Sequence, residues 1–333
     1  MLPAEGEKVL PAEAGSTFGK YQLFATLGRG GMADVFLAVA RGPMGFNKLA
    51  VVKRLRTALS EEPAFLSMFL DEARLAARLS HPNIVHTYEV GEESSSYFIA
   101  MEYLEGQPLN KIIKEAAKTQ KKVDPALAAR LVADALHGLH HAHELKDYDG
   151  TPLRIIHRDV SPHNIFVTYD GIVKLVDFGI AKAALSSTHT EVGVLKGKVA
   201  YMAPEQAVGG AVDRRADLFA MGIVLWELLT RRRLMTGDTA AATLHRLVSL
   251  PVPRVSDALP DVDPKLDAIV AKALEKDPAK RFQTAAEMRD ALEAFAMTSG
   301  TARTEDVGAL VVDMFGTVRA DVQKQIQAHM AKV

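Results

Sequence analysis

The sequence has no cysteine among its 333 residues. This absence excludes disulfide bonds, thiolate metal sites and thiol redox chemistry. The chain also lacks an excess of charge of either sign, because 41 Asp and Glu side chains balance 40 Lys and Arg side chains, for a formal net charge of −1. We therefore expect neither a nucleic-acid partner nor attraction to an anionic membrane surface.

Long apolar runs are missing as well. The longest, from Leu218 to Leu229, is too short to span a bilayer and contains Glu227. The N-terminus, Met1 to Glu7, is acidic and has no signal-peptide pattern. The chain is 48% hydrophobic and 24% charged, the balance of a globular protein with room for two cores of ordinary size. We expect a cytoplasmic enzyme that does not bind a membrane.

The pattern along the chain changes from β-like to helical. Residues 1–17 are rich in Ala, Glu, Gly and Pro and predict a disordered leader. Five short apolar runs then predict strands, and a longer segment among them predicts a helix at about 63–79. The strand runs are 21–27, 35–39, 49–54, 84–90 and 97–101. This part, 18–105, is expected to form a mostly β lobe.

The second part, 106–297, is expected to form a mostly helical lobe, joined to the first at 102–106. Apolar residues at helical spacing predict its principal helices at 125–143, 217–230, 265–275 and 284–295. A short strand pair, 165–168 and 172–176, surrounds the turn dipeptide Asp170-Gly171. The turn signal Asp149-Gly150 predicts a hairpin-like insertion at 146–154.

The last segment, 298–333, predicts a helical extension. Apolar residues recur there at helical spacing: Val307, Leu310, Val311, Met314, Val318, Val322, Ile326 and Met330. The favoured interpretation is a terminal helix that packs on its own domain. The alternative is a helix that docks a partner or joins two copies in a dimer.

A glycine-rich loop lies between the first two predicted strands. It reads Leu27, Gly28, Arg29, Gly30, Gly31, Met32, Ala33, Asp34, Val35. Glycines let a backbone approach phosphate groups closely. An ordinary hairpin is the alternative for this loop by itself, and a dinucleotide-binding loop is disfavoured because a helix should follow it.

Lys53 ends an apolar strand, and the helix after it carries Glu72 on its apolar face. An unpaired carboxylate there is costly, so Lys53 is the expected partner. The alternative is a Glu at the helix edge that reaches solvent. In the helical part, His157-Arg158-Asp159 and Asn164 precede the short strand pair, and Asp177-Phe178-Gly179 follows it. Two carboxylates and an amide brought together at strand ends suit a hard cation beside a phosphoryl group.

Residues 18 to about 297 resemble a Hanks-type protein kinase domain of the bacterial serine/threonine group. The resemblance is carried by the ordered set of these motifs, followed by Ala203-Pro204-Glu205. It implies a bilobal α+β protein kinase fold with a small, mainly antiparallel β lobe. It also implies transfer of the γ-phosphate of ATP to serine and threonine hydroxyls of protein substrates, including autophosphorylation. ATP and Mg²⁺ would be required, with Mn²⁺ as an alternative metal.

The same resemblance implies roles for individual residues. Lys53 would hold the α- and β-phosphates, Glu72 would hold Lys53, and Asp159 would be the catalytic base, while Asn164 and Asp177 hold the metal. The glycine-rich loop would cover the phosphates. The residues at the adenine would be Val35, Val51, Met101 and Phe166, with the hinge at Glu102 and Tyr103.

Three further residues would have structural roles by this resemblance. Asp217 would hold the backbone of the catalytic loop, and Glu205 and Arg281 would form a buried ion pair.

Two residues depart from the family pattern close to the chemistry. Ser161 stands where serine/threonine kinases carry a Lys, and Lys198 stands where they carry a Thr. We hypothesise that Lys198 supplies the cation beside Asp159 and that Ser161 supplies the hydroxyl. The alternative is a degraded site with reduced or no activity.

Arg158 precedes the catalytic Asp and suits a phosphate on the activation segment. That segment offers Ser186, Ser187, Thr188 and Thr190, of which the two threonines are favoured. An unmodified polar loop is the alternative.

Competing functions rest on fewer residues. A pseudokinase that binds nucleotide or acts as a scaffold is supported only by Ser161 and Lys198. A small-molecule kinase is disfavoured by the complete Ala-Pro-Glu segment, and the catalytic loop lacks the tyrosine-kinase pattern. Four histidines at 137–143 are interpreted as partly exposed residues at a helix end, with a metal site as the minor alternative.

Overall fold

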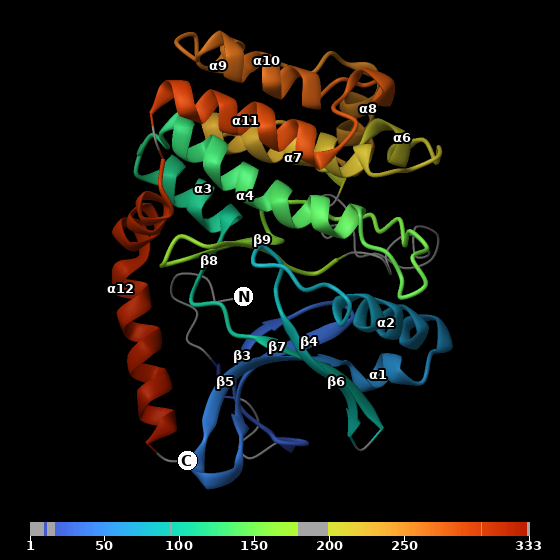
Figure 1. Ribbon diagram of the computed structural model, residues 1–333, viewed down its shortest axis with the longest axis vertical. Helices are drawn as coiled ribbons and strands as arrows, with labels where there is room; N and C mark the ends of the chain where they lie inside the picture. Colours follow the sequence, from blue (N-terminus) through green and yellow to red (C-terminus); the bar gives the residue numbers. More distant parts are fainter. Residues whose placement is uncertain (1–9, 12–16, 94, 179–198, 301, 332–333) are drawn as a thin grey trace.

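Two lobes lie one above the other and are joined between β7 (Ser96–Glu102) and β8 (Gly106–Pro108), as Figure 1 shows. The structure is a computed structural model that describes residues 10–11, 17–93, 95–178, 199–300 and 302–331. The predicted bilobal α+β fold is confirmed. The smaller lobe is mainly an antiparallel sheet and the larger lobe is mainly helical.

The sheet of the small lobe has the strand order β1-β3-β4-β5-β7-β6, and β2 pairs with β3. Its other strands are β1 (Leu10–Pro11), β2 (Thr17–Phe18), β3 (Tyr21–Arg29), β4 (Ala33–Arg41), β5 (Asn47–Leu55) and β6 (Thr87–Glu93). Alternation along β3 buries Tyr21, Leu23 and Leu27, as expected for a strand that faces a core on one side. Two parts of the predicted disordered leader, Leu10–Pro11 and Thr17, are strand residues, because they pair with β3.

One long helix packs against this sheet. After the short α1 (Thr57–Ser60), α2 (Pro63–Ala76) begins with a proline in its first turn, where no backbone N–H is needed. Its buried residues Phe69 and Ala73 meet Leu55 and Ile99 of the sheet in one apolar cluster. The helix ends three residues before the predicted Leu79, which is buried in the core of the large lobe instead.

The large lobe contains one extensive apolar core, to which most of its helices contribute. They are α3 (Leu109–Lys118), α4 (Pro125–His143), α6 (Pro204–Ala207), α7 (Arg215–Thr230), α8 (Ala240–Ser249), α9 (Val255–Ala258), α10 (Pro264–Ala273) and α11 (Ala285–Ser299). A small sheet of β8, β9 (Ile165–Thr168) and β10 (Val173–Leu175) lies on the side that faces the small lobe (Figure 1). Three-residue 3₁₀ helices occur at Pro43–Gly45 and Pro278–Lys280.

Helix α4 is the axis of the large lobe. It starts after Asp124, whose carboxylate accepts hydrogen bonds from the backbone N–H groups of Ala126 and Leu127 at 2.8 and 3.2 Å. Within it, Gly138 lies against the segment that joins α2 to β6. A Cβ at this position would be 2.6 Å from the carbonyl oxygen of Asn83, so only glycine permits this approach.

The C-terminal helix α12 (Thr304–Met330) runs along one side of both lobes (Figure 1). Val307, Leu310, Val311 and Phe315 are buried in the core of the large lobe, which confirms the expected packing on its own domain. The predicted insertion is also present, because Lys146 and Pro152 form an isolated antiparallel bridge around Gly150. Among the described helices none combines the length and the apolar content that a bilayer crossing requires.

Candidate functional site

A lysine, a glutamate and an aspartate from three different elements meet between the lobes. Lys53 on β5 places its Nζ 2.5 Å from Oε1 of Glu72 on α2 and 2.9 Å from Oδ1 of Asp177, which follows β10. The side chains of Lys53 and Glu72 are only 14% and 13% exposed, whereas that of Asp177 is 44% exposed. The pairing of Lys53 with Glu72 that the sequence predicted is therefore present, and Asp177 adds a contact across the lobes.

The electrostatics of this group favour a permanently charged lysine. Burial lowers the pKa of Lys53, but the negative charges of Asp177 and Glu72 outweigh it and raise the pKa above its usual range. A cation held in this way cannot act as a proton donor near neutral pH. It is suited to binding an anion such as a phosphate group.

The segment with Asp159 lies just before β9 and is held by side-chain contacts. Asn164 donates through Nδ2 to the backbone oxygen of Asp159 at 2.9 Å and to its Oδ2 at 2.8 Å. This contact fixes the carboxylate and leaves the amide oxygen of Asn164 as a group able to take a metal. Arg158 and Asp177 have positive φ angles of 62° and 53°, which are unusual for residues with a side chain and often occur at functional sites.

Asp217 at the start of α7 binds the backbone of this loop. Its Oδ2 accepts a hydrogen bond from the backbone N–H of His157, and its Oδ1 accepts one from that of Arg158, both at 2.8 Å. The side chain is 2% exposed, and Nε2 of His143 lies 2.9 Å from Oδ2. Asp217 thus contacts the backbone of the loop as expected, and His143 is a partner that the sequence did not suggest.

The glycine-rich loop joins β3 to β4. Gly28 pairs with Val35 and Arg29 with Asp34, and the turn between them is closed by a hydrogen bond from Gly30 N to Ala33 O at 2.9 Å. Several of the residues expected to surround adenine lie on strands of the sheet, next to this loop. Leu27 and Val51 are buried in one apolar cluster, packed with Val35, Met101 and Tyr103.

Phe166 comes from the other lobe. It is buried on β9, in register with Pro108 and Lys174, and does not belong to that cluster among the described residues.

Two carboxylates tie the hinge to the large lobe. Oε1 of Glu102 lies 2.5 Å from Nζ of Lys174 on β10 and also accepts a hydrogen bond from His86 N at 2.7 Å. Glu105, just beyond the hinge, lies 3.0 Å from Nε of Arg319 on α12. Sequence reasoning missed Lys174 and Arg319, because neither belongs to a motif and both lie far along the chain from the hinge.

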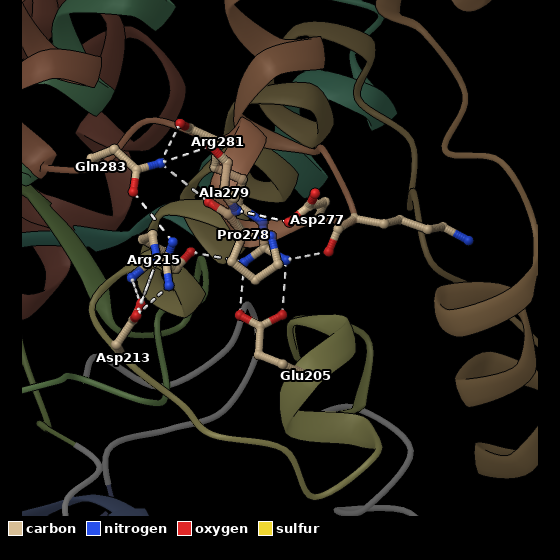
Figure 2. Close-up of polar contacts among 9 residues, drawn as sticks. Glu205, Asp213, Arg215, Asp277, Pro278, Ala279, Arg281 and Gln283 are labelled. Atoms are coloured by element: carbon tan, nitrogen blue, oxygen red, sulfur yellow. Dashed lines mark hydrogen bonds and ion pairs between the residues drawn. The ribbon is translucent and has the colours of Figure 1, made fainter.

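The Ala-Pro-Glu segment is anchored by the expected ion pair (Figure 2). Glu205 lies 2.7 Å from Nη1 and 2.8 Å from Nη2 of Arg281, whose side chain is fully buried. Arg281 also donates to the backbone oxygens of Glu275, Lys276 and Arg215. With all its donors satisfied, this arginine can remain charged inside the lobe.

A second buried contact holds the same segment. The Tyr201 hydroxyl donates to Oε2 of Glu227 on α7 at 2.7 Å, and Arg233 lies beside both groups. Burial, followed by the charge of Glu227, raises the pKa of Tyr201 above its usual range. Burial also raises the pKa of Glu227.

Several predicted residues lie outside the described residues. They are Gly179, Ser186, Ser187, Thr188, Thr190 and Lys198. Ser161 is described and is 8% exposed, and its backbone oxygen accepts a hydrogen bond from Asn164 N at 3.0 Å. In the described part of the chain, which includes the four histidines at 137–143, no group of three or more His, Asp or Glu side chains is arranged to hold a metal.

The groups between the lobes fit a nucleotide with a divalent metal. The amide oxygen of Asn164 and the exposed carboxylate of Asp177 are oxygen ligands of the kind that hard cations prefer. Lys53 carries a positive charge of the kind that binds phosphate oxygens.

Comparisons with known proteins agree with this geometry. A family model described as "Protein kinase domain" matches residues 21–292. The tyrosine-protein kinase MasK of Myxococcus xanthus is 44% identical over 278 residues, which are 84% of this chain and 43% of MasK. The serine/threonine-protein kinase PrkC of Bacillus subtilis is 36% identical over 270 residues, 81% of this chain and 39% of PrkC. The serine/threonine-protein kinase PknB of Mycobacterium tuberculosis is 38% identical over 277 residues, 81% of this chain and 42% of PknB.

Among solved structures, the crystal structure of the PknI kinase domain from Mycobacterium tuberculosis covers 86% of this chain and 99% of its own. The TM-score is 0.62 and the sequence identity 28%. The chain spans less than half the length of the three curated relatives named above. From its sequence, its fold and the arrangement of its site, the chain belongs to the protein kinase family, in the Hanks-type bacterial group.

Proposed function

We propose that this chain transfers the γ-phosphate of ATP to serine and threonine hydroxyls of proteins, including its own. Protein kinases in general use ATP and a divalent metal. The observation that carries the proposal is Lys53, a buried cation held by Glu72 from one lobe and by Asp177 from the other. A positive charge fixed between the lobes is suited to binding the negatively charged triphosphate of a nucleotide.

The protein's own residues divide the chemistry as follows. Lys53 binds phosphate oxygens and keeps its charge because Glu72 and Asp177 flank it. Asp159 accepts the proton of the substrate hydroxyl, and Asn164 holds its carboxylate in position. Asn164 and Asp177 hold the metal, for which we propose Mg²⁺ with Mn²⁺ as the alternative. When bound, the metal neutralises charge on the phosphates.

The test compares Asp159→Asn with wild type in the presence of labelled ATP, Mg²⁺ and a generic protein substrate. Loss of a general base lowers turnover by about 10²- to 10⁴-fold, while nucleotide binding is retained. The exposed Asp261→Asn serves as the matched control and should behave as wild type. Equal transfer by wild type and Asp159→Asn would contradict the assigned base, and no transfer by wild type would favour the pseudokinase alternative.

Tyrosine phosphorylation is a second candidate, supported by the resemblance to a relative named a tyrosine-protein kinase. The relatives named serine/threonine kinases support the first candidate. Phosphoamino-acid analysis of the labelled product separates the two, because each hydroxyl class gives a distinct phosphoamino acid.

The exchange of Ser161 and Lys198 stays part of the proposal. In it, Lys198 supplies the cation beside Asp159, and Lys198→Ala lowers turnover strongly; unchanged turnover would end the idea.

Phosphorylation of Thr188 or Thr190, with the phosphate bound by Arg158, is proposed as the activating event. Mass spectrometry of active protein checks it.

The boundaries and partners are also proposals. We divide the chain into a leader at 1–17, lobes at 18–105 and 106–297, and an extension at 298–333. We expect the domain to act in the cytoplasm, where ATP is available, on protein substrates and without nucleic-acid or membrane binding. A dimer through α12 would have to use its outer face, which includes the exposed Val312, because the buried stripe packs within the chain. Analytical ultracentrifugation tests for such a dimer.

A further inference from the structure

Helix α12 is additional to the part of the chain that the family model describes. That model ends at residue 292, and α12 begins at Thr304. The helix nevertheless contacts both lobes and crosses the level of the hinge (Figure 1). Its contacts occur in three places, and each involves different chemistry.

The first half of α12 is fixed to the large lobe. Gly308 and Gly171 let the two backbones approach, because a Cβ on Gly171 would lie 1.9 Å from the carbonyl oxygen of Thr304 and a Cβ on Gly308 2.7 Å from that of Tyr169. The Tyr169 hydroxyl, which is buried, also donates to the backbone oxygen of Phe315 at 3.3 Å. This half therefore has one defined position on the turn between β9 and β10.

The middle of α12 holds the residue that follows the hinge. Oε1 of Glu105 accepts hydrogen bonds from Nε of Arg319 at 3.0 Å and from Nε2 of Gln323 at 2.6 Å. The guanidinium of Arg319 also lies 4.9 Å from the ring centroid of Tyr169, which is part of the first attachment. Glu105 is thus connected through α12 to the rigid part of the large lobe.

The end of α12 reaches the small lobe. Ile326 packs on the apolar cluster that contains Val51, which is expected at the adenine, and Leu27 of the glycine-rich loop. Beside it, the ring of His329 stacks on Phe24 of β3, with 4.1 Å between centroids and 15° between planes. A segment outside the family model therefore contributes to the cluster beneath the sheet.

We propose that α12 positions the hinge and the adenine side of the small lobe for nucleotide binding, with Arg319, Gln323 and Ile326 as positioning residues. The inference rests on the proposed function in that the nucleotide is held at the hinge. Arg319 and Glu105 are partly exposed, so their ion pair alone is weak. The ion pair acts by positioning, because it fixes Glu105 relative to a helix that is already attached to both lobes.

The experiment measures the Kd of a non-hydrolysable ATP analogue with Mg²⁺, and the KM for ATP and kcat, on the full chain. Arg319→Ala combined with Gln323→Ala should raise the Kd and the KM by about three- to tenfold and leave kcat near wild type. Ile326→Ala acts through a different contact and should shift the Kd in the same direction. Lys324→Ala, whose nearest described carboxylate is that of Asp321 on the same helix, is the matched control and should leave the Kd unchanged.

A charge exchange gives a second, independent measurement. Glu105→Arg and Arg319→Glu should each weaken analogue binding, and the double variant should recover part of the loss. An unchanged or lower Kd in the Arg319 and Gln323 variant overturns the inference, as does a double variant no better than either single one. Because binding is measured without transfer, these results stay separate from the test of the proposed function, which measures label transfer and the phosphoamino acid formed.

Discussion

Arg281 shows what a single buried side chain contributes here. Its guanidinium is fully buried and binds Glu205, as Figure 2 shows. It also donates to three backbone oxygens. Arg281→Ala would leave the carboxylate of Glu205, which is 13% exposed, without its cation. We expect the free energy of unfolding to fall by about 3–5 kcal/mol, the usual cost of breaking a buried ion pair from one side.

Urea denaturation checks this value. The control is Arg303→Ala, since Arg303 is 68% exposed and pairs only with Asp306 one turn away in the helix among the described residues. Its loss should leave the free energy of unfolding close to that of wild type, because exposed ion pairs are screened by solvent. Equal losses for the two variants would show that Arg281 does not support the fold as its contacts suggest.

Single residues were predictable from the sequence where a local pattern demands a partner or where they belong to a motif. Lys53 and Glu72 belong to the first kind, because a glutamate on an apolar helix face needs a cation. Lys174 and His143 belong to neither kind. Each meets its partner, Glu102 or Asp217, through the packing of distant elements.

At the scale of elements, sequence signals worked best where local chemistry sets a boundary. Helix α4 runs over the predicted 125–143, because Asp124 and Pro125 fix its start. Helices α3 and α8, of ten residues each, are not among the principal helices expected from the sequence. The strand predicted at 84–90 begins at Thr87, because Ile84 is buried in the large lobe and forms a single bridge to Leu175.

Two Asp-Gly turns offer an element-scale prediction about how α12 is attached. Gly150 and Gly171 have φ angles of 87° and 85°, so alanine is strained at either position. Of the two, Gly171 faces another element, because a Cβ there would meet Thr304 of α12, whereas no atom of the described residues lies within 4 Å of a Cβ at Gly150.

We expect Gly150→Ala to lose about 1 kcal/mol of unfolding free energy from strain alone. Gly171→Ala should lose about 1–3 kcal/mol more, because overpacking adds to the same strain. Urea denaturation measures both losses, and limited proteolysis should cut α12 faster in the Gly171 variant only. Matching behaviour of the two variants would mean that the turn does not hold the helix.

At the scale of the whole molecule, several connections join the lobes besides the chain itself. They include the pair of Lys53 with Asp177, the pair of Glu102 with Lys174, the pair of Arg78 with Asp147, and helix α12. The first of these can also be bridged by ligand. We therefore expect both lobes of the wild-type protein to unfold together when it is heated.

Nucleotide should stabilise this joined state. A ligand that binds only folded protein adds about 2.7 kcal/mol at a concentration one hundred times its Kd. ATP with Mg²⁺ should therefore raise the Tm, and a chelator should remove most of the rise, because Asn164 and Asp177 then hold no metal against the phosphates. Differential scanning calorimetry with and without EDTA measures the effect, and a Tm that does not respond to ATP would contradict the assigned site.

Beyond a kink at Phe315, the regular geometry of α12 makes the positions of its later attachments depend on helical phase. Each residue of an α-helix turns the side chains that follow by about 100° and advances them by about 1.5 Å. One residue inserted between Phe315 and Arg319 would turn Arg319, Gln323 and Ile326 away from their partners together. An insertion of seven residues would restore their direction but carry them about 10 Å too far. The number of residues in α12 is therefore constrained by the distance from the β9–β10 turn to the small lobe.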